Sequence, residues 1–292
     1  MLHMEISRKL FYYYHGLGDS LLFNSVLFEL GQQNRRRYFV GTKHAEIYRG
    51  NPFAMVLPFS QTMNYKLGKI FSLLGGRVEH VDYYHKGHPP KQHILELLAD
   101  RVGLRDAPRT PKIFLTEEEK NKRLLPESNK PWVAIQSTGL STWTDNKNWG
   151  VENFRAVARS LEKDFSLVQL GATGDPSLGV DLELQGRWPI RDVFLVLSEC
   201  KLFIGQEGFL MHAAAAVDLP AVIVFGGFLA PWQTGYHWNA NLYSDIECAP
   251  CWLETACPYE KKCMSIITPE QVVSEAFTIL HKSSMLKKIK DD

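Results

Sequence analysis

Hydrophobic residues in this chain form short runs rich in β-branched and aromatic side chains, and these runs alternate with stretches of helical periodicity. The pattern is clearest in the second half, where residues 154, 157, 158 and 161 form one apolar helix face. It predicts strands over 131–137, 165–173, 201–206 and 221–227, and helices over 151–163, 190–200 and 209–218. Strands that alternate with helices are typical of α/β folds with parallel sheets.

The first half shows the same alternation less regularly. Lys9–Tyr14 is predicted as a strand, Ser20–Leu30 as a helix and Tyr38–Val40 as a second strand. Residues 105–130 are polar and contain several prolines, which is typical of a connection between domains. We therefore expect two domains, 1–125 and 126–292, with similar architecture.

One further helix is predicted near the end of the chain. Thr268 and Gln271 have the spacing of a capping box, with Pro269 at the first helical position. The helix is expected to run from there through QVVSEAFTILHK.

Charge and composition exclude several classes of protein. Lys and Arg total 33 against 32 Asp and Glu, so no overall field favours nucleic acid as a partner. No apolar stretch reaches the roughly 20 residues of a membrane span, and MLHMEISRKL does not resemble a signal peptide. We expect a soluble, cytoplasmic protein. The short basic runs Arg35–Arg37 and Lys287–Lys290 favour solvated surface, although the second could also rest on an anionic inner membrane surface.

The stretch HGLGDS, residues 15–20, follows the first predicted strand. It is not a dinucleotide fingerprint, because Leu21 stands where G-x-G-x-x-G requires a third glycine. Gly16, Gly18 and Asp19 lie where ligands bind in open α/β sheets, at the carboxyl end of a strand. Asp19 is therefore a candidate for chemistry, and a simple helix cap is an equally good interpretation of its position.

A second candidate site lies within residues 203–227, where a strand meets a helix of small residues. The helix N-terminus at Gly208 offers free N–H groups to a diphosphate. Glu207 can accept hydrogen bonds from sugar hydroxyls, and His212 lies in the first turns of the helix. The alternative is an ordinary strand–helix joint with a buried structural histidine.

Two neighbouring joints are expected at the same edge of the sheet, QSTGLSTWTDNKNW at 136–149 and LGATGDPS at 170–177. Several backbone N–H groups and one lysine would compensate about two negative charges of a diphosphate without a metal. Together the joints suggest a nucleotide pocket. Their candidate donor contacts are Ser137, Thr138, Lys147 and Gly171.

The order of these motifs resembles glycosyltransferase family 9, the heptosyltransferase family. The resemblance is carried by GLGD at 16–19, by Lys147 and Trp149 in K-x-W, by G-x-E-G-x-x-x-H-A-A-A from Gly205 to Ala215, and by PAVIVFGG at 220–227. It implies a GT-B fold: two Rossmann-like domains, with acceptor bound mainly by the first and nucleotide sugar by the second. It also implies an inverting glycosyltransferase that needs no metal for catalysis, and no D-x-D element argues otherwise.

The resemblance assigns roles to the candidate residues. Asp19 would be the general base, and Gly16 and Gly18 would make room for the acceptor. Lys147 and the Glu207–His212 turn would stabilise the departing diphosphate. The family commonly has Asp-Ser/Thr-Gly where this chain has Glu207-Gly208-Phe209, so a hydroxyl is missing from the donor turn and the acid is longer. ADP-heptose is the expected donor, and the acceptor stays open among lipopolysaccharide core, another glycan and a protein.

Four of the five cysteines lie within sixteen residues, in C-x2-C-x5-C-x5-C spacing. Such spacing can enclose one tetrahedral zinc or iron, against the alternative of four reduced thiols in a tight loop. The cluster is Cys248, Cys251, Cys257 and Cys263. It resembles the iron-binding finger of family members that glycosylate autotransporter proteins, which implies a structural metal.

Two other functions suit the same architecture. A sugar-nucleotide epimerase also has two Rossmann-like domains around a nucleotide. A non-catalytic protein that binds a nucleotide sugar would keep the donor pocket alone.

Overall fold

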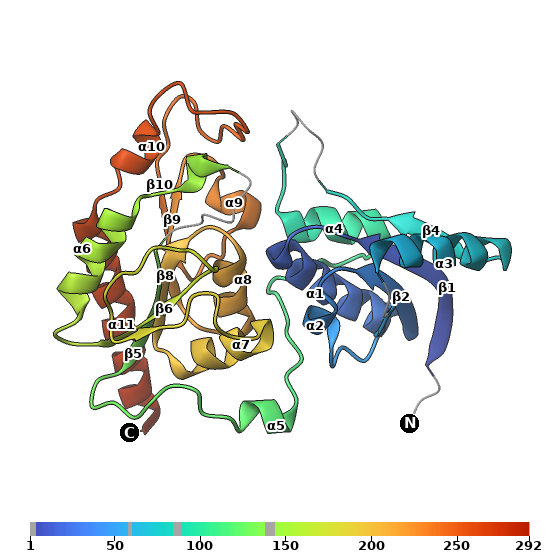
Figure 1. Ribbon diagram of the computed structural model, residues 1–292, viewed down its shortest axis with the longest axis horizontal. Coiled ribbons are helices and arrows are strands. Elements are labelled where there is room, and N and C mark those ends of the chain that lie inside the picture. Colours follow the sequence, from blue (N-terminus) through green and yellow to red (C-terminus); the bar gives the residue numbers. More distant parts are fainter. Residues whose placement is uncertain (1–3, 58–59, 84–88, 138–143, 292) are drawn as a thin grey trace. The chain divides into compact units, whose positions relative to one another are not determined.

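A computed structural model describes residues 4–57, 60–83, 89–137 and 144–291, with side chains described as far as residue 281 (Figure 1). The chain divides into two compact units, residues 1–121 and 122–292. The division falls a few residues before the one expected from the sequence, in the same polar connection.

The first unit contains four strands and five helices among its described residues. They are β1 (Glu5–Tyr13), α1 (Leu17–Asn34), β2 (Arg36–Thr42), α2 (Ala45–Tyr48), β3 (Ala54–Val56), α3 (Gln61–Leu73), β4 (Arg77–His80), α4 (Ile94–Val102) and α5 (Glu117–Lys120). The strands form one parallel sheet in the order β3-β2-β1-β4.

The second unit has a larger parallel sheet of six strands in the order β10-β9-β8-β5-β6-β7. Its elements are β5 (Trp132–Gln136), η1 (Asp145–Lys147), α6 (Val151–Leu161), β6 (Ser166–Leu170), β7 (Leu182–Glu183), α7 (Ile190–Glu199), β8 (Leu202–Gln206), α8 (Phe209–Ala216), β9 (Ala221–Gly226), α9 (Pro231–Thr234), β10 (Ala240–Tyr243), α10 (Lys262–Ser265) and α11 (Pro269–Asp291). The predicted α/β fold with parallel sheets is confirmed.

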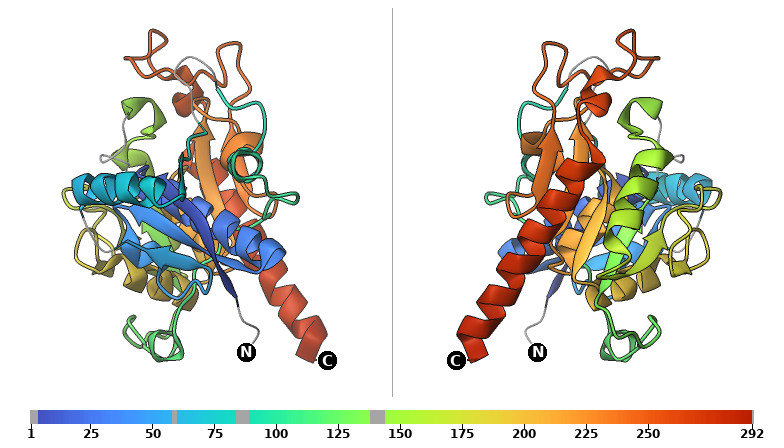
Figure 2. Two further views of the ribbon diagram at one scale, coloured as in Figure 1. Left: turned by 90° about the vertical axis from the view of Figure 1, so that its right-hand side faces the viewer. Right: turned by 90° about the vertical axis from the view of Figure 1, so that its left-hand side faces the viewer.

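Helices cover both faces of the second sheet. In Figure 1, α6 and α11 lie on one face, and α7 and α8 lie on the other. Figure 2 shows the long α11 running beside this sheet. The core beneath α6 and α11 is apolar, and it includes the fully buried Phe154 and Leu161 from the predicted helix face. Small residues in α8, from Ala213 to Ala215, are also buried and allow that helix to pack closely.

Successive side chains of β1 point to opposite faces of the first sheet, as expected of a β-strand. Phe11 and Tyr13 of β1 contact Phe23 of α1. Tyr12 points the other way and fills the space beside Gly68 of α3, where an added Cβ would lie 2.0 Å from the phenol oxygen. Both faces of β1 are therefore buried, as its apolar run suggests.

Each sheet has one topological switch point, where the connections leave in opposite directions. In the first unit it lies between β1 and β4, and in the second between β5 and β8. Ligands of open α/β sheets bind beyond the carboxyl ends of the strands at this point. The segments that follow these four strands are therefore where a functional site is expected.

Two local predictions have clear outcomes. The capping box at the start of α11 is confirmed: Thr268 N–H donates to Gln271 Oε1 at 2.9 Å, and Gln271 N–H to Thr268 Oγ1 at 3.4 Å. In contrast, α1 begins at Leu17 and not at Ser20. Gly16 is the N-cap, so Asp19 lies inside the first helical turn. Of the helices in the described residues, none is both long and apolar enough to cross a bilayer.

Candidate active site

Asp19 lies at the switch point of the first sheet, in the first helical turn of α1, the helix that follows β1. Its Oδ2 accepts the Gly16 N–H at 3.1 Å, which closes the first turn of α1. Its Oδ1 accepts the Tyr83 hydroxyl at 2.6 Å. The side chain is half-buried. The carboxylate therefore does cap the helix with one oxygen, and it still presents the other oxygen to a polar group beyond the cap.

Tyr83 was not found by sequence reasoning. It lies after β4, the strand beside β1, so the topology of the sheet brings it to Asp19 across 64 positions of sequence. Tyr13 lies beneath them, fully buried, and burial with the neighbouring Asp19 raises its pKa well above the ordinary value. No sequence motif marks Tyr83, because the contact depends on strand order.

Gly16 of HGLGDS has a local reason that the sequence did not show. A Cβ on Gly16 would lie 2.9 Å from Asp19 Oδ2, so glycine leaves room for the carboxylate itself. Gly18 lies in the first turn of α1. The expectation that these glycines accommodate an acceptor stays a prediction.

Lys147 and Glu207 meet at the switch point of the second sheet. Their Nζ and Oε2 are 2.5 Å apart, and the side chains are only 11% and 7% exposed. Lys147 lies in η1, which follows β5, and Glu207 directly follows β8. The ammonium also lies 5.2 Å from the centre of the Phe228 ring. Two groups that the sequence assigned separately, one to diphosphate and one to sugar, are thus a single buried ion pair.

The turn after β8 leads into the N-terminus of α8. Gly208 has φ +151°, in the region that favours glycine, and it is the N-cap. His212 is buried in α8, and its Nδ1 lies 2.7 Å from the hydroxyl oxygen of Tyr236. Burial and the nearby Glu207 carboxylate raise the pKa of Tyr236 well above 10.0, so this phenol keeps its proton at neutral pH. The sequence analysis did not single out Tyr236.

The remaining donor candidates have mixed positions. Ser137, directly after β5, is fully buried and accepts a hydrogen bond from Gln169 Nε2 at 3.0 Å. Gly171 adjoins Asp175, whose Oδ2 would lie 2.4 Å from an added Cβ, so the turn itself requires the glycine. Thr138 lies outside the described residues.

Gln206 connects two of these segments, and the sequence did not single it out. It is the last residue of β8, and its side-chain oxygen accepts the Trp149 N–H at 2.6 Å. The bond ties the end of the K-x-W motif to the strand that precedes Glu207. In the sequence, Gln206 is marked only as a polar residue at the end of an apolar strand.

The four clustered cysteines line one small cavity of about 40 Å³, and all are free thiols. Burial raises the pKa of Cys251 and Cys263 above the ordinary value. Among the described residues, no group of three or more His, Cys, Asp or Glu side chains is arranged to hold a metal ion. The thiols share a cavity, and thiols are ligands that suit soft metals.

Comparison with known proteins identifies the family. The description of glycosyltransferase family 9 (heptosyltransferase) matches residues 81–262, more than half of the chain. The chain belongs to this family. The match includes Lys147, the Glu207–His212 turn and Cys248 to Cys257, whereas Asp19 lies before it.

One curated relative is lipooligosaccharide heptosyltransferase 2 of Campylobacter jejuni, 35% identical over 158 residues. That match covers 48% of this chain and 48% of the relative, so the chain matches about half of that protein's length. Two solved structures share the fold. Escherichia coli ADP-heptose lipopolysaccharide heptosyltransferase II has a TM-score of 0.72 at 16% identity, covering 96% of this chain and 100% of that one. The iron-containing dodecameric glycosyltransferase TibC of enterotoxigenic E. coli has a TM-score of 0.72 at 17% identity, covering 96% and 79%. The GT-B fold class is confirmed.

Proposed function

We propose that this protein is an inverting glycosyltransferase that moves a heptose from ADP-heptose to a hydroxyl of a lipopolysaccharide-core acceptor. The observation that carries the proposal is the meeting of Lys147, Glu207 and the N-terminus of α8 at the switch point of the second sheet. A buried cation beside free helix N–H groups suits a diphosphate, and the adjoining carboxylate suits sugar hydroxyls.

Asp19 acts as the general base in this proposal. Its carboxylate takes the proton of the acceptor hydroxyl as that oxygen forms a bond to the anomeric carbon. The bond between that carbon and the diphosphate oxygen breaks on the opposite face, so the configuration at the anomeric carbon is inverted. The proton ends on Asp19, and Tyr83 holds the carboxylate through its 2.6 Å hydrogen bond.

The leaving diphosphate gains negative charge as the bond breaks. The Lys147 ammonium has three N–H donors, so it can keep its bond to Glu207 while it donates to a phosphate oxygen. The free N–H groups at the start of α8 add a second source of positive potential. Both groups are already in place before the reaction, which is the arrangement that stabilises a transition state efficiently.

The choice of donor and acceptor rests on the relatives. The fold is shared with TibC, which is described in complex with ADP-D-β-D-heptose at a TM-score of 0.70 and 17% identity. The curated relative is named for lipooligosaccharide, which favours a lipopolysaccharide-type acceptor over a protein. The proposed donor turn of this chain, Glu207-Gly208-Phe209, differs from the Asp-Ser/Thr-Gly that is common in the family.

A transfer assay tests the proposal. The protein is incubated with ADP-heptose and a heptose-deficient lipopolysaccharide core, and the mass of the acceptor is measured by mass spectrometry. We expect the acceptor to gain one heptose and ADP to be released. Conversion of the donor in the absence of acceptor would favour an epimerase, and tight binding without either reaction would favour a non-catalytic protein.

We further propose that the four clustered cysteines hold one structural iron or zinc. The chemistry of the donor set supports this, since four thiols line a single cavity. The ion would link the two ends of the loop and would take no part in transfer.

Purified protein is expected to contain about one iron or zinc per chain by mass spectrometry of the metal. Cys257→Ser should lower that content severalfold, because it removes one of four ligands. Cys200→Ser is the matched control, since Cys200 is a buried thiol outside the cluster. Wild-type protein without bound metal, isolated anaerobically from metal-replete cells, would contradict the proposal.

A cytoplasmic protein that touches the inner membrane surface is the third part of the proposal. The run Lys287–Lys290 lies beyond the described side chains, but α3 offers a described surface. Its Leu73 and the following Leu74 are 86% and 79% exposed, and the exposed Lys66 and Lys69 lie on the same helix. Exposed apolar side chains beside lysines suit an anionic lipid surface.

Replacing Lys66 and Lys69 with glutamine should weaken binding to phosphatidylglycerol vesicles. Each lysine near such a surface contributes about 1 kcal/mol, so we expect roughly thirtyfold weaker binding in a vesicle sedimentation assay. Glutamine at the exposed Lys122 and Lys163 of the second unit changes the net charge equally and serves as the control. Equal binding by both double variants would refute a role for α3.

A further inference from the structure

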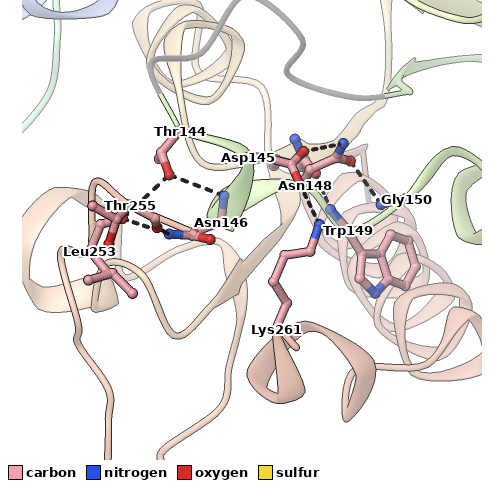
Figure 3. Close-up of polar contacts among 10 residues, drawn as sticks. Thr144, Asp145, Asn146, Asn148, Trp149, Gly150, Leu253, Thr255 and Lys261 are labelled. Atoms are coloured by element: carbon pink, nitrogen blue, oxygen red, sulfur yellow. Dashed lines mark hydrogen bonds and ion pairs between the residues drawn. The ribbon is translucent and has the colours of Figure 1, made fainter. Parts of the chain in front are cut away.

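The turn that carries Lys147 is bonded to the cysteine finger, which we define as residues 248–263. Asn146 Nδ2 donates to the carbonyl oxygens of Leu253 and Thr255, at 2.6 and 2.8 Å (Figure 3). Thr144 Oγ1 donates to the same Leu253 carbonyl at 3.4 Å. The turn thus depends on a segment more than a hundred residues later in the chain.

An ion pair adds a fourth contact on the exposed side of the turn. Lys261 Nζ lies 2.7 Å from Asp145 Oδ2, and this hydrogen bond lowers the pKa of Asp145 below its ordinary value (Figure 3). Each of the three residues that precede Lys147 is therefore attached to the finger by its side chain.

The finger also contacts the segment of Phe228, the residue whose ring lies beneath the Lys147 ammonium. The Trp252 N–H donates to the Phe228 carbonyl at 3.1 Å, and the Cys251 N–H donates to the Gly227 carbonyl at 3.0 Å. The rings of Phe228 and Trp252 have centroids 5.8 Å apart. The lysine therefore lies between two segments, its own turn and the Phe228 segment, and both are bonded to the same loop.

The positions of the accepting carbonyls follow from the shape of the loop. Leu253 and Thr255 lie in an irregular stretch between Cys251 and Cys257, without helix or strand to hold them. Asn146 is only 6% exposed, so water cannot easily replace its two bonds. A change in the conformation of the finger would leave buried polar groups unpaired unless the turn moved with it.

We propose that the cysteine finger is the positioning element for Lys147 and that it acts chiefly through Asn146. The finger sets where the ammonium stands, and thereby how tightly the second unit binds a nucleoside diphosphate. The second statement rests on the proposed function, whereas the first concerns the protein without ligand. The two are tested by separate measurements on the same variants.

Asn146→Asp keeps the side-chain volume and removes both N–H donors. We expect the amide hydrogens of residues 144–149 to exchange at least tenfold faster, measured by mass spectrometry without nucleotide. We also expect the Kd for ADP to rise at least tenfold by calorimetry, with the KM for acceptor unchanged. Asn239→Asp is the matched control: Asn239 is 9% exposed, lies in the same unit and contacts Ala221 through its oxygen. It should leave both the exchange of 144–149 and ADP binding as in the wild type.

A second, exposed pair keeps the test decisive if Asn146→Asp does not fold. Lys261→Asp places two carboxylates together at the turn and should raise the Kd for ADP about threefold. Adding Asp145→Lys should restore the Kd, because the reversed pair can form the same bond.

Faster exchange in 144–149 and the charge-reversal rescue would support the proposal. Unchanged exchange in a folded Asn146→Asp, or no effect of Lys261→Asp, would overturn it. Wild-type protein that does not bind ADP would contradict the proposed function, in which the donor is an ADP sugar. The amide hydrogen exchange of residues 144–149 would still test the role of the finger.

Discussion

Asp19→Asn is expected to lower the kcat for sugar transfer about a thousandfold, within the 10²–10⁴ typical of a general base. The amide keeps the size of the carboxylate, and its oxygen can still accept one of the bonds from Gly16 and Tyr83. It cannot take the proton of an acceptor hydroxyl. The KM for donor should change little, because Asp19 belongs to the first unit and the donor groups belong to the second.

The control for this variant is Asp82→Asn. Asp82 is an exposed carboxylate next to Tyr83, and its contact to His15 is a distant 3.9 Å. Its replacement should leave kcat within about threefold of wild type, because exposed ion pairs contribute little. Transfer assays on both variants, with thermal unfolding to confirm the fold, decide the matter. Equal rates for wild type and Asp19→Asn would exclude Asp19 as the base.

Lys147→Met is the second change with a large expected effect. It removes the cation that faces the leaving diphosphate, which should lower kcat about a hundredfold or more. It also leaves Glu207 buried without its partner, which should reduce the free energy of unfolding by about 3 kcal/mol. Loss of transfer and loss of stability are thus expected together, and a second variant is needed to separate them.

The double variant Lys147→Met/Glu207→Gln makes that separation. It has no unpaired buried charge, so most of the lost stability should return in urea unfolding experiments. Transfer should not return, because neither side chain can now donate to phosphate as an ammonium does. A double variant that recovers both stability and wild-type kcat would show that the pair serves the fold alone.

Much of the fold followed from local pattern. The four central strands of the second unit, β5, β6, β8 and β9, were predicted to within a few residues because their apolar runs are bounded by turn residues. The cap of α11 was predicted because its partners are three positions apart. The short edge strands β7 and β10 were missed. The start of α1 was missed for a local reason of a different kind. Gly16 can serve as N-cap, and the Asp19 carboxylate can reach back to it, so three more residues join the helix.

The candidate site was predicted less completely. Lys147, Glu207 and His212 were each singled out, but as separate contacts to a ligand. In the structure Lys147 pairs with Glu207 and lies over the ring of Phe228, and His212 contacts Tyr236. Phe228 follows β9 and Tyr236 follows α9, so both come from other segments of the second unit. Gly171 also has a local reason in the neighbouring Asp175 carboxylate, and its contact to the donor stays a prediction.

The sequence by itself determined the α/β class, the central strands and long helices of the second unit, the motif-bearing turns at strand ends and the likeness to glycosyltransferase family 9. These depend on residues close together in the chain, so periodicity and spacing record them. Only the tertiary structure decided that Tyr83 meets Asp19, that Lys147 pairs with Glu207 and that Asn146 joins the cysteine finger. Strand order and loop path bring these groups together, and neither leaves a local trace in the sequence because the partners are more than fifty residues apart.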